Sequence, residues 1–281
     1  MNVVYTREAL QAELQKYRAQ QQSIGFVPTM GALHDGHLAL VDATRRQASC
    51  TVVSIFVNPV QFNDPQDYAL YPRTIEADLQ LLDAHQADLV FIPEVQEIYP
   101  QGTAHLETYA LGTLETVLEG AYRPGHFQGV ARVMRRLLEL VQPDVLVMGE
   151  KDYQQCLIIQ RLLQLMGLSP RFYMHPTVRE TDGLAMSSRN RRLSDTDRRK
   201  ATLIYESLMY ISSQWRNMPF ERLQAVVSEQ LQAAGFVIDY VVIARSADLQ
   251  ILHAPEDTQM RALIAATLSG VRLIDNMVIN P

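Results

Sequence analysis

Two histidines, His34 and His37, lie three residues apart in the stretch from Pro28 to His37, which reads PTMGALHDGH. An apolar run precedes this stretch and a run with helical spacing follows it, so the pattern predicts a strand, a glycine-bearing turn and a helix start. A helix start presents unpaired backbone N–H groups and the positive end of the helix dipole to an anion. A single histidine near a turn is more often an ordinary surface or core residue. Two imidazoles at this spacing, each able to donate hydrogen bonds, favour a nucleotide phosphate site.

A second candidate segment, Gly149 to Gln155, directly follows the apolar run Val145–Met148. Gly149 is suited to open a turn there, Asp152 to cap the next helix, and Lys151 to project over the carboxyl edge of the predicted sheet, where ligands bind in open α/β folds. A lysine at that edge can neutralise phosphate charge. Alone, Lys151 is more simply explained as an exposed residue at a helix start, but the phosphate-binding turn from another strand favours the functional interpretation.

Further polar segments complete the candidate site. The loop Gly183–Asn190 carries two hydroxyls and Arg189, which suits a lid that closes on phosphates, although an ordinary linker is an equal alternative. Because its polar residues offer few apolar anchors, we expect the segment Thr177–Asn190 to be mobile without ligand. Gln61 and Gln155 follow different strands, and their amides suit a small substrate with hydroxyls and a carboxylate; an exposed glutamine is the commoner explanation of either one.

These residues need an alternating α/β framework to position them. Apolar runs predict strands at 24–27, 50–57, 88–92, 145–148 and 171–174, and helical spacing predicts helices at 6–22, 38–43, 74–85, 128–141 and 152–166, with an irregular segment at 64–73. Alternation of this kind predicts a mostly parallel sheet with helices on both faces. After Pro176 the predicted order is helices at 195–215 and 219–234, then strands at 236–244, 260–268 and 272–278. We therefore expect a domain at 1–176 and a smaller α+β domain at 177–281.

Composition narrows the function classes. Of 281 residues 47% are apolar and 20% charged, which is ordinary for a globular enzyme. The net charge of −6 offers no electrostatic case for nucleic acid or for an anionic membrane. Cys50 and Cys156 show no metal-ligand spacing, and no apolar run predicts a signal core or a membrane span. We expect a cytoplasmic protein whose partners are small molecules.

The sequence also resembles a known family. The motifs PTMGALHDGH, FVNPVQF, YPRT, RPGHFQGV, GEKDYQQ, RETDGLAMSSRN and RLIDN occur in the order seen in the pantothenate synthetase (pantoate–β-alanine ligase) family. HxGH is the signature of the wider nucleotidyl-transferring α/β superfamily. The resemblance implies a Rossmann-like first domain, a smaller lid domain, magnesium accompanying ATP, a homodimer, and synthesis of the coenzyme A precursor pantothenate through a pantoyl adenylate, with AMP and pyrophosphate released.

The resemblance also implies roles for individual residues. ATP would be bound by Met30, Gly31, Ala32, Leu33, His34, Asp35, Gly36, His37, Gly149, Glu150, Lys151, Asp152, Val178, Met186, Ser187, Ser188 and Arg189. Catalysis would involve His37 as an acid, with His34, Lys151 and Arg189 supplying charge or hydrogen bonds. Gln61 and Gln155 would hold pantoate, and Gln61 would also border β-alanine.

Some features leave alternatives open. Arg132, Met134 and Arg192 stand where the family usually has threonine, valine and tyrosine. An acidic pair associated with magnesium in some relatives is represented only by Glu76 and Asp78, so the metal ligands stay open with Asp78 as the candidate.

Three other classes of function are weighed against the ligase. A plain nucleotidyltransferase would leave AMP on its product, and a tRNA synthetase would need more tRNA-binding surface. A nucleotide sensor would not need both Lys151 and the lid.

Overall fold

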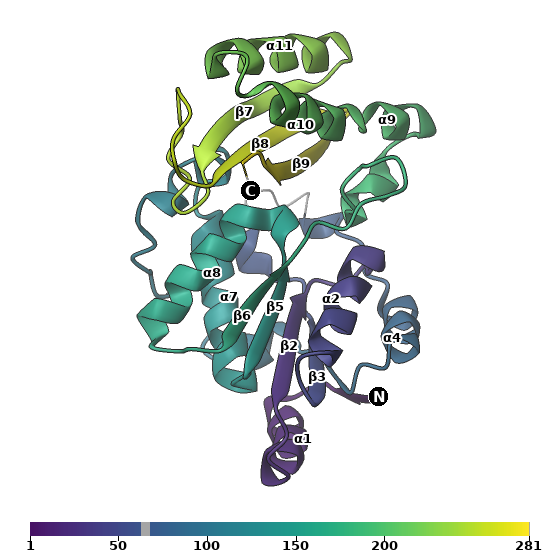
Figure 1. The fold of residues 1–281 in the computed structure, drawn as a ribbon. Helices are drawn as coiled ribbons and strands as arrows, with labels where there is room; N and C mark the ends of the chain where they lie inside the picture. Colours follow the sequence, from purple (N-terminus) through teal and green to yellow (C-terminus); the bar gives the residue numbers. More distant parts are fainter. Residues whose placement is uncertain (63–67, 281) are drawn as a thin grey trace. The chain divides into compact units, whose positions relative to one another are not determined.

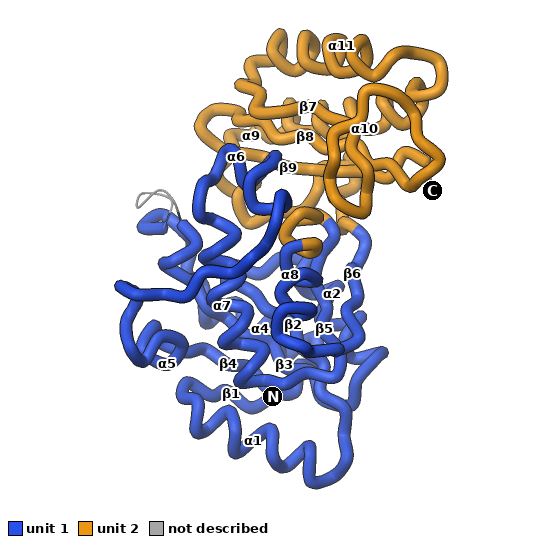
Figure 2. The backbone as a smooth tube through the Cα atoms, turned by 90° about the vertical axis from the view of Figure 1, so that its left-hand side faces the viewer, with its two compact units in different colours: residues 1–150, 158–176 blue, residues 151–157, 177–281 orange. Residues whose placement is uncertain are grey.

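The computed structural model of the chain describes residues 1–62 and 68–280. The chain forms two compact units, shown in Figure 2: unit 1 comprises Met1–Glu150 and Ile158–Pro176, and unit 2 comprises Lys151–Leu157 and Thr177–Pro281. Each unit has a hydrophobic core of its own. The irregular segment predicted at 64–73 lies largely outside the described residues.

Unit 1 is built on a six-stranded parallel sheet with the order β1-β4-β3-β2-β5-β6 (Figure 1). Its strands are β1 (Asn2–Val4), β2 (Ile24–Thr29), β3 (Cys50–Ile55), β4 (Leu89–Phe91), β5 (Val145–Gly149) and β6 (Arg171–His175). The parallel α/β sheet expected from the alternating pattern is confirmed. The sequence did not predict β1, because three residues are too few to show a period.

The central strands are buried on both sides, which explains their continuous apolar runs. In β2, Phe26 and Val27 are both fully buried, and successive side chains of a strand point to opposite faces. Val27 belongs to a core cluster with residues of α2 (Asp35–Arg45) and α4 (Ile75–Ala84), and these two helices contact each other. On the opposite face, α1 (Arg7–Ala19) packs against α7 (His126–Val141), which also contacts β2.

Helix boundaries follow local capping in most cases. The Thr6 hydroxyl accepts a hydrogen bond from Ala9 N at 3.2 Å, as its sequence position predicts. Thr74 differs, because its hydroxyl makes no cap to the backbone and instead donates to the Asp78 carboxylate. The other described helical segments of unit 1 are η1 (Pro59–Gln61), α5 (Val95–Ile98), η2 (Gly112–Glu115) and α6 (Glu119–Tyr122). Helix α8 (Tyr153–Met166) follows η3 (Glu150–Asp152), and both bear residues of unit 1 and unit 2.

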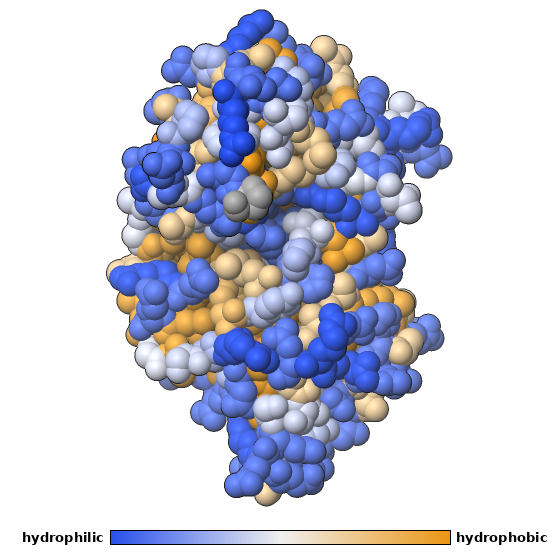
Figure 3. Space-filling model, viewed as in Figure 1, coloured by the Kyte–Doolittle hydropathy of each residue, from blue (hydrophilic) through white to orange (hydrophobic). Residues whose placement is uncertain are grey.

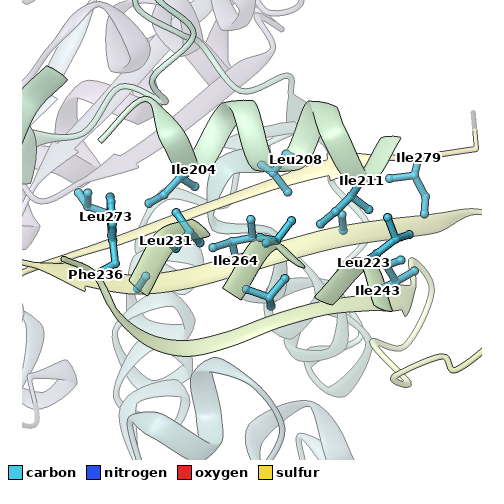
Figure 4. Close-up of a cluster of buried hydrophobic side chains, with 14 of the residues drawn as sticks. Ile204, Leu208, Ile211, Leu223, Leu231, Phe236, Ile243, Ile264, Leu273 and Ile279 are labelled. Atoms are coloured by element: carbon cyan, nitrogen blue, oxygen red, sulfur yellow. The ribbon is translucent and has the colours of Figure 1, made fainter. Parts of the chain in front are cut away.

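Unit 2 consists of an antiparallel sheet, β7 (Val237–Arg245), β8 (Met260–Leu268) and β9 (Val271–Val278), with α9 (Asp195–Lys200), α10 (Leu203–Gln214), α11 (Phe220–Ala233) and η4 (Ser188–Arg192). Figure 4 shows its core, in which apolar side chains of α10 and α11 meet those of the sheet. The small α+β architecture expected after Pro176 is confirmed. The helix predicted at 195–215 is divided at Ala201–Thr202, where the Thr202 hydroxyl bonds to the Arg199 carbonyl in a local turn.

In the described ranges, no helix combines the length and the apolar character needed to cross a membrane. The face drawn in Figure 3 is mainly hydrophilic, with apolar residues between the hydrophilic ones. Large apolar side chains that are exposed include Leu165 of α8 and Leu168. Scattered apolar exposure of this extent is common on protein surfaces.

Candidate functional site

The histidine-bearing turn lies at the carboxyl end of β2, between Thr29 and the start of α2 at Asp35. Its backbone enters the left-handed region twice in succession, at Gly31 (φ 78°) and at Ala32 (φ 51°). Glycine tolerates this conformation, whereas alanine adopts it at a cost of order 1–3 kcal/mol that the surroundings must offset. The turn is therefore held in place by contacts from outside itself.

Those contacts come from the Asp78 carboxylate, which is 1% exposed. Its Oδ2 accepts a hydrogen bond from Ala32 N at 2.9 Å, and its Oδ1 accepts one from Leu33 N at 2.8 Å and one from the Thr74 hydroxyl at 3.1 Å. A Cβ added at Gly31 would lie 3.0 Å from Asp78 Oδ2, so the turn sits directly on the carboxylate. Hydrogen bonds to a charged carboxylate are among the stronger ones in proteins.

The same turn places the two imidazoles side by side. His34 is the N-cap of α2, and its Nδ1 accepts a hydrogen bond from Gly36 N at 3.2 Å. A neutral ring that accepts at Nδ1 carries its proton at Nε2, which makes Nε2 a donor. The ring of His37 is 4.1 Å from that of His34 between centroids. The start of α2 thus combines helix-end N–H groups with imidazole groups, which is the chemistry a phosphate requires.

Gln61 lies at the end of η1, after β3, and its side chain is nearly buried. The Gln61 Nε2 group donates to Met30 Sδ at 3.0 Å, so the structure brings Gln61 next to the histidine-bearing turn. A thioether is a weak acceptor, and a substrate carboxylate or hydroxyl offered to Nε2 is a stronger one. The other end of the amide is fixed, because Oε1 accepts a hydrogen bond from Asn58 Nδ2.

Asn58 is a fully buried residue that the sequence analysis missed. Besides Gln61 Oε1, its Nδ2 donates to the Gly129 carbonyl at 3.2 Å, while its Oδ1 accepts from Val60 N and from the Tyr99 hydroxyl at 2.9 Å. Asn58-Pro59 directly after a buried strand is the sequence signal that marks this turn. Asn58 thereby fixes the orientation of the Gln61 amide, with Oε1 towards Asn58 and Nε2 towards Met30.

The Tyr99 hydroxyl that donates to Asn58 belongs to a side chain that is itself held by an ion pair. The Arg136 guanidinium lies 4.9 Å from the centroid of the Tyr99 ring and pairs through both nitrogens with the Glu107 carboxylate. Hydrogen bonding from Arg136 holds the pKa of Glu107 at about 2, below its usual 4.5, and burial raises the pKa of the Tyr99 hydroxyl. Arg132, at a position where threonine was expected from the family resemblance, donates a hydrogen bond to the Glu107 carbonyl. It therefore also helps to fix Glu107.

Helix α7 approaches Gln61 closely at Gly129. A Cβ at Gly129 would lie 2.4 Å from the Val60 carbonyl oxygen and 2.6 Å from Gln61 Cα, so only glycine fits. One turn earlier, His126 Nδ1 is 2.8 Å from the Gln61 carbonyl oxygen. The motif RPGHFQGV therefore serves to pack α7 against the Gln61 backbone.

In unit 2, Lys151 lies in η3 two residues after β5, and its ammonium is 3.7 Å from the Asp152 carboxylate. Its backbone carbonyl accepts a hydrogen bond from Asn276 Nδ2 of β9 at 2.9 Å. Gln155 is half-buried in the first turn of α8.

The segment Thr177–Asn190 folds back on itself in unit 2. Met186 N donates to the Val178 carbonyl at 3.0 Å, and the Ser187 hydroxyl caps η4 by accepting from Arg189 N. Leu184 is 4% exposed and belongs to the core of unit 2. The expectation that this segment has few apolar anchors is therefore wrong at its centre: a backbone turn that exposes its polar residues turns Leu184 inward.

The predicted site residues divide between the units. Unit 1 carries Met30–His37, Gln61, Gly149 and Glu150, and unit 2 carries Lys151, Asp152, Gln155, Val178 and Met186–Arg189. Within unit 1, the structure joins Gln61 to the turn through Met30. Within unit 2, β9 contacts the segments that carry Lys151 and Val178. Which of these residues touch substrate stays a prediction.

Unit 1 also contains a cavity of about 380 Å³ at the carboxyl ends of β2, β3 and β4. Met30, Gly31, Phe56, Arg73, Asp78 and Ile92 are among its lining residues. Strand ends around an open space are the usual ligand position in doubly wound sheets.

Among residues 1–62 and 68–280, no group of three or more His, Cys, Asp or Glu side chains is arranged to hold a metal ion. Both cysteines are buried and free, and burial raises the pKa of Cys50 to about 12, so its thiol is not poised as a nucleophile. The oxygens of Asp78, the candidate metal ligand, accept the hydrogen bonds described above.

The parallel sheet and the histidine-bearing turn at a strand's carboxyl end define the class of HxGH nucleotidyl-transferring α/β proteins. Comparison with known proteins narrows the class. The family described as pantoate-beta-alanine ligase matches residues 2–278. A pantothenate synthetase from Methylococcus capsulatus is 43% identical over 100% of this chain and 98% of that protein, and one from Thioalkalivibrio sulfidiphilus is 44% identical over the same shares.

Solved structures agree with this comparison. A pantothenate synthetase from Thermus thermophilus is 42% identical and superimposes with a TM-score of 0.93 over 100% of both chains. A pantoate-beta-alanine ligase from Francisella tularensis, complexed with beta-gamma ATP and beta-alanine, is 34% identical with a TM-score of 0.83, covering 99% of this chain and 98% of that one. The chain belongs to the pantoate–β-alanine ligase family. The family, the fold class and the enzyme class predicted from sequence are confirmed.

Proposed function

We infer that the chain joins pantoate to β-alanine at the expense of ATP, through a pantoyl adenylate, and releases AMP and pyrophosphate. The observation that carries this inference is the turn at the start of α2. There His34 and His37 stand together on a backbone fixed by Asp78, and Gln61 reaches the same turn through Met30. A phosphate site at this turn would lie next to the Gln61 amide, which can hold a carboxylate. That arrangement suits a reaction in which the carboxylate attacks phosphorus.

In the first step, a carboxylate oxygen of pantoate bonds to the α-phosphorus of ATP while the bond to pyrophosphate breaks. Gln61 and Gln155 would hold pantoate. ATP would be held by Met30–His37 together with Gly149–Asp152, Val178 and Met186–Arg189. His37 would act as an acid, and His34, Lys151 and Arg189 would stabilise negative charge at phosphorus. Alignment and charge stabilisation are the main catalytic effects available for such a reaction.

In the second step, the β-alanine amine attacks the acyl carbon of the adenylate, loses a proton and displaces AMP. Gln61 would border β-alanine as well as pantoate. The buried support of Gln61 by Asn58 suits this double use, because a fixed amide can hold the acyl group during both attacks. A closed site would keep water from the adenylate.

Magnesium would enter bound to ATP. Mg²⁺ is usually held by substrate phosphates, water and one or two carboxylates rather than by an all-protein cage. The described residues fit that arrangement, since they form no preformed cluster and the Asp78 carboxylate faces backbone N–H groups. When bound, the ion supplies charge neutralisation at the phosphates, and Asp78 acts on the backbone of the turn.

The remaining expectations belong to the same proposal. Residues 1–176 would form the domain that binds ATP and pantoate, and residues 177–281 the lid domain. The enzyme would be a cytoplasmic homodimer that acts on small molecules and binds neither nucleic acid nor membrane. Sedimentation of the purified full chain at several concentrations tests the dimer.

Isotope exchange tests the adenylate. With ATP, magnesium and pantoate, and without β-alanine, the enzyme should exchange labelled pyrophosphate into ATP. Adding β-alanine should then produce AMP and pantothenate in equal amounts. Exchange that requires β-alanine, or release of ADP, would contradict the adenylate route, and AMP retained in a stable product would indicate a nucleotidyltransferase.

A further inference from the structure

The motif RLIDN, at Arg272–Asn276 in β9, contains two adjacent buried polar residues that the mechanism above does not use. Asp275 and Asn276 are each 4% exposed. Buried polar side chains in an otherwise apolar sheet are costly unless their hydrogen bonds are made. Their partners lie far away in sequence.

Asp275 binds the segment that leads to Arg189. Its carboxylate pairs with both nitrogens of the Arg179 guanidinium, at 2.5 and 3.0 Å, and Arg179 also donates to the Gly183 carbonyl at 3.1 Å. The guanidinium lies 4.6 Å from the centroid of the Tyr205 ring, and a Cβ at Gly183 would strike the same ring at 2.1 Å. Asp275 thus holds the Arg179 guanidinium, which in turn bonds to the Gly183 carbonyl at the other end of the turn. Burial raises the pKa of the Asp275 carboxyl, and Arg179 opposes that shift.

Asn276 binds the other segment. Its Nδ2 donates to the Lys151 carbonyl at 2.9 Å, and its Oδ1 accepts from Arg261. Arg261 is 3% exposed and stacks 3.8 Å from the centroid of the Tyr153 ring, two residues after Lys151. The Tyr153 hydroxyl in turn donates to the Ser246 carbonyl. The segment Lys151–Tyr153 is therefore bound to unit 2 through the Lys151 carbonyl and through the Tyr153 side chain.

We propose that Asp275 and Asn276 are positioning residues that hold the Lys151 segment and the Arg179–Arg189 segment in register for the transferred phosphate group. The proposal rests on the assignment of Lys151 and Arg189 to the nucleotide site. Adjacent residues of one strand alternate in direction, so one rigid strand reaches two segments at once. A displacement of about 1 Å at such groups can lower kcat by roughly 100-fold.

A double-mutant cycle between positions 276 and 151 tests the inference. Asn276→Asp keeps an acceptor for Arg261 but removes the donor to the Lys151 carbonyl, and Asn276→Ala removes both bonds. Each should lower kcat by about 10- to 100-fold with a smaller change in the KM for ATP. In a Lys151→Ala background, the same changes should alter kcat by no more than about twofold, because Asn276 acts through Lys151.

A parallel cycle combines Asp275→Asn with Arg189→Ala, and circular dichroism melting shows whether each variant is folded. If Asp275→Asn does not fold, the Asn276 cycle still decides the proposal. Asp239→Asn is the matched control, since Asp239 forms an ion pair with Arg272 of β9 at 2.7 Å and so tests the loss of a carboxylate partner in the same sheet. It should leave kcat unchanged.

The outcomes distinguish a wrong assignment of Lys151 from a wrong positioning role for Asn276. If Lys151→Ala keeps normal kcat, the assignment of Lys151 to the nucleotide site fails. If Lys151→Ala is slow and the Asn276 changes lower kcat equally in both backgrounds, the positioning role is overturned while the proposed function stands.

Discussion

The turn Met30–His34 in unit 1 and the segment Thr177–Asn190 in unit 2 each contain a glycine with a positive φ, and both depend on a buried carboxylate. In the turn, Asp78 accepts hydrogen bonds from the backbone N–H groups of Ala32 and Leu33. In the segment, Asp275 accepts from the side chain of Arg179. One carboxylate fixes the main chain itself, and the other fixes a long side chain that the main chain carries.

The two stretches therefore differ in how directly their backbones are restrained. In the turn, Asp78 bonds directly to two consecutive N–H groups and so restrains the backbone at Ala32. The left-handed conformation of Ala32 needs that restraint. In the segment, the Arg179–Asp275 ion pair and the buried Leu184 side chain fix the middle. Met186–Arg189 follow Leu184 in the chain. The turn is thus held at its backbone, whereas Met186–Arg189 are held by local bonds, from Met186 N to the Val178 carbonyl and from Arg189 N to the Ser187 hydroxyl.

The largest effect is expected at the charged end of the second segment. Arg189→Ala should lower kcat by about 100- to 1,000-fold, the usual loss when one preorganised group facing transition-state charge is removed. The melting temperature should change little, because Arg189 is only half-buried. Steady-state kinetics with Arg191→Ala as a control on the same η4 turn checks this. Normal turnover in Arg189→Ala would remove the segment from the chemistry.

A smaller effect is expected in the turn. Asp78→Asn places an NH₂ group against a backbone N–H, so kcat/KM for ATP should fall by about 10- to 100-fold as the turn shifts. The exposed Glu76 of the same helix is the control, and Glu76→Gln should behave as the parent. If Asp78 restrains the backbone, extra magnesium will not restore activity. Recovery at high magnesium would instead identify Asp78 as a metal ligand.

The amide next to the turn provides a more selective test. Gln61→Ala should raise the pantoate requirement by about 5- to 150-fold, which corresponds to 1–3 kcal/mol for a buried polar group that loses its partner. ATP affinity should remain nearly normal, because Gln61 meets the turn at the Met30 side chain rather than at its backbone N–H groups. Equilibrium binding of each substrate measures the two effects separately. Equal weakening for ATP would place the pantoate pocket elsewhere.

The smallest effect concerns acid stability in unit 1. The pKa of Glu107 is about 2 in the folded protein against an ordinary 4.5, so the pair with Arg136 stabilises the fold above pH 4.5. That stabilisation is lost as the pH falls from 4.5 towards 2. Because both side chains are partly exposed, the gain should stay below about 1 kcal/mol. The difference in melting temperature between the parent and Glu107→Gln should shrink across this range; a constant difference would contradict the ionic role.

Much of the molecule was determined by local sequence. The apolar runs predicted β2, β3, β4 and β5 because strands buried on both faces need continuous apolar side chains. The edge strand β6, which is partly exposed, was predicted from its place after the helix 152–166 in the alternating pattern. The glycines and histidines of PTMGALHDGH predicted the turn, since helix starts and left-handed residues have local requirements. Motif order identified the family over nearly the whole chain.

Only the tertiary structure decided what holds these motifs in place. Asp78 reaches Ala32 and Leu33 across more than forty residues, whereas its position in the family resemblance suggested a metal ligand rather than a backbone restraint. Asn276 reaches the Lys151 carbonyl across 125 residues. Such bonds depend on where separate elements meet, and no spacing along the chain encodes that distance. The sequence therefore identified the residues that present chemistry, and the packing of distant elements determined the buried groups that align them.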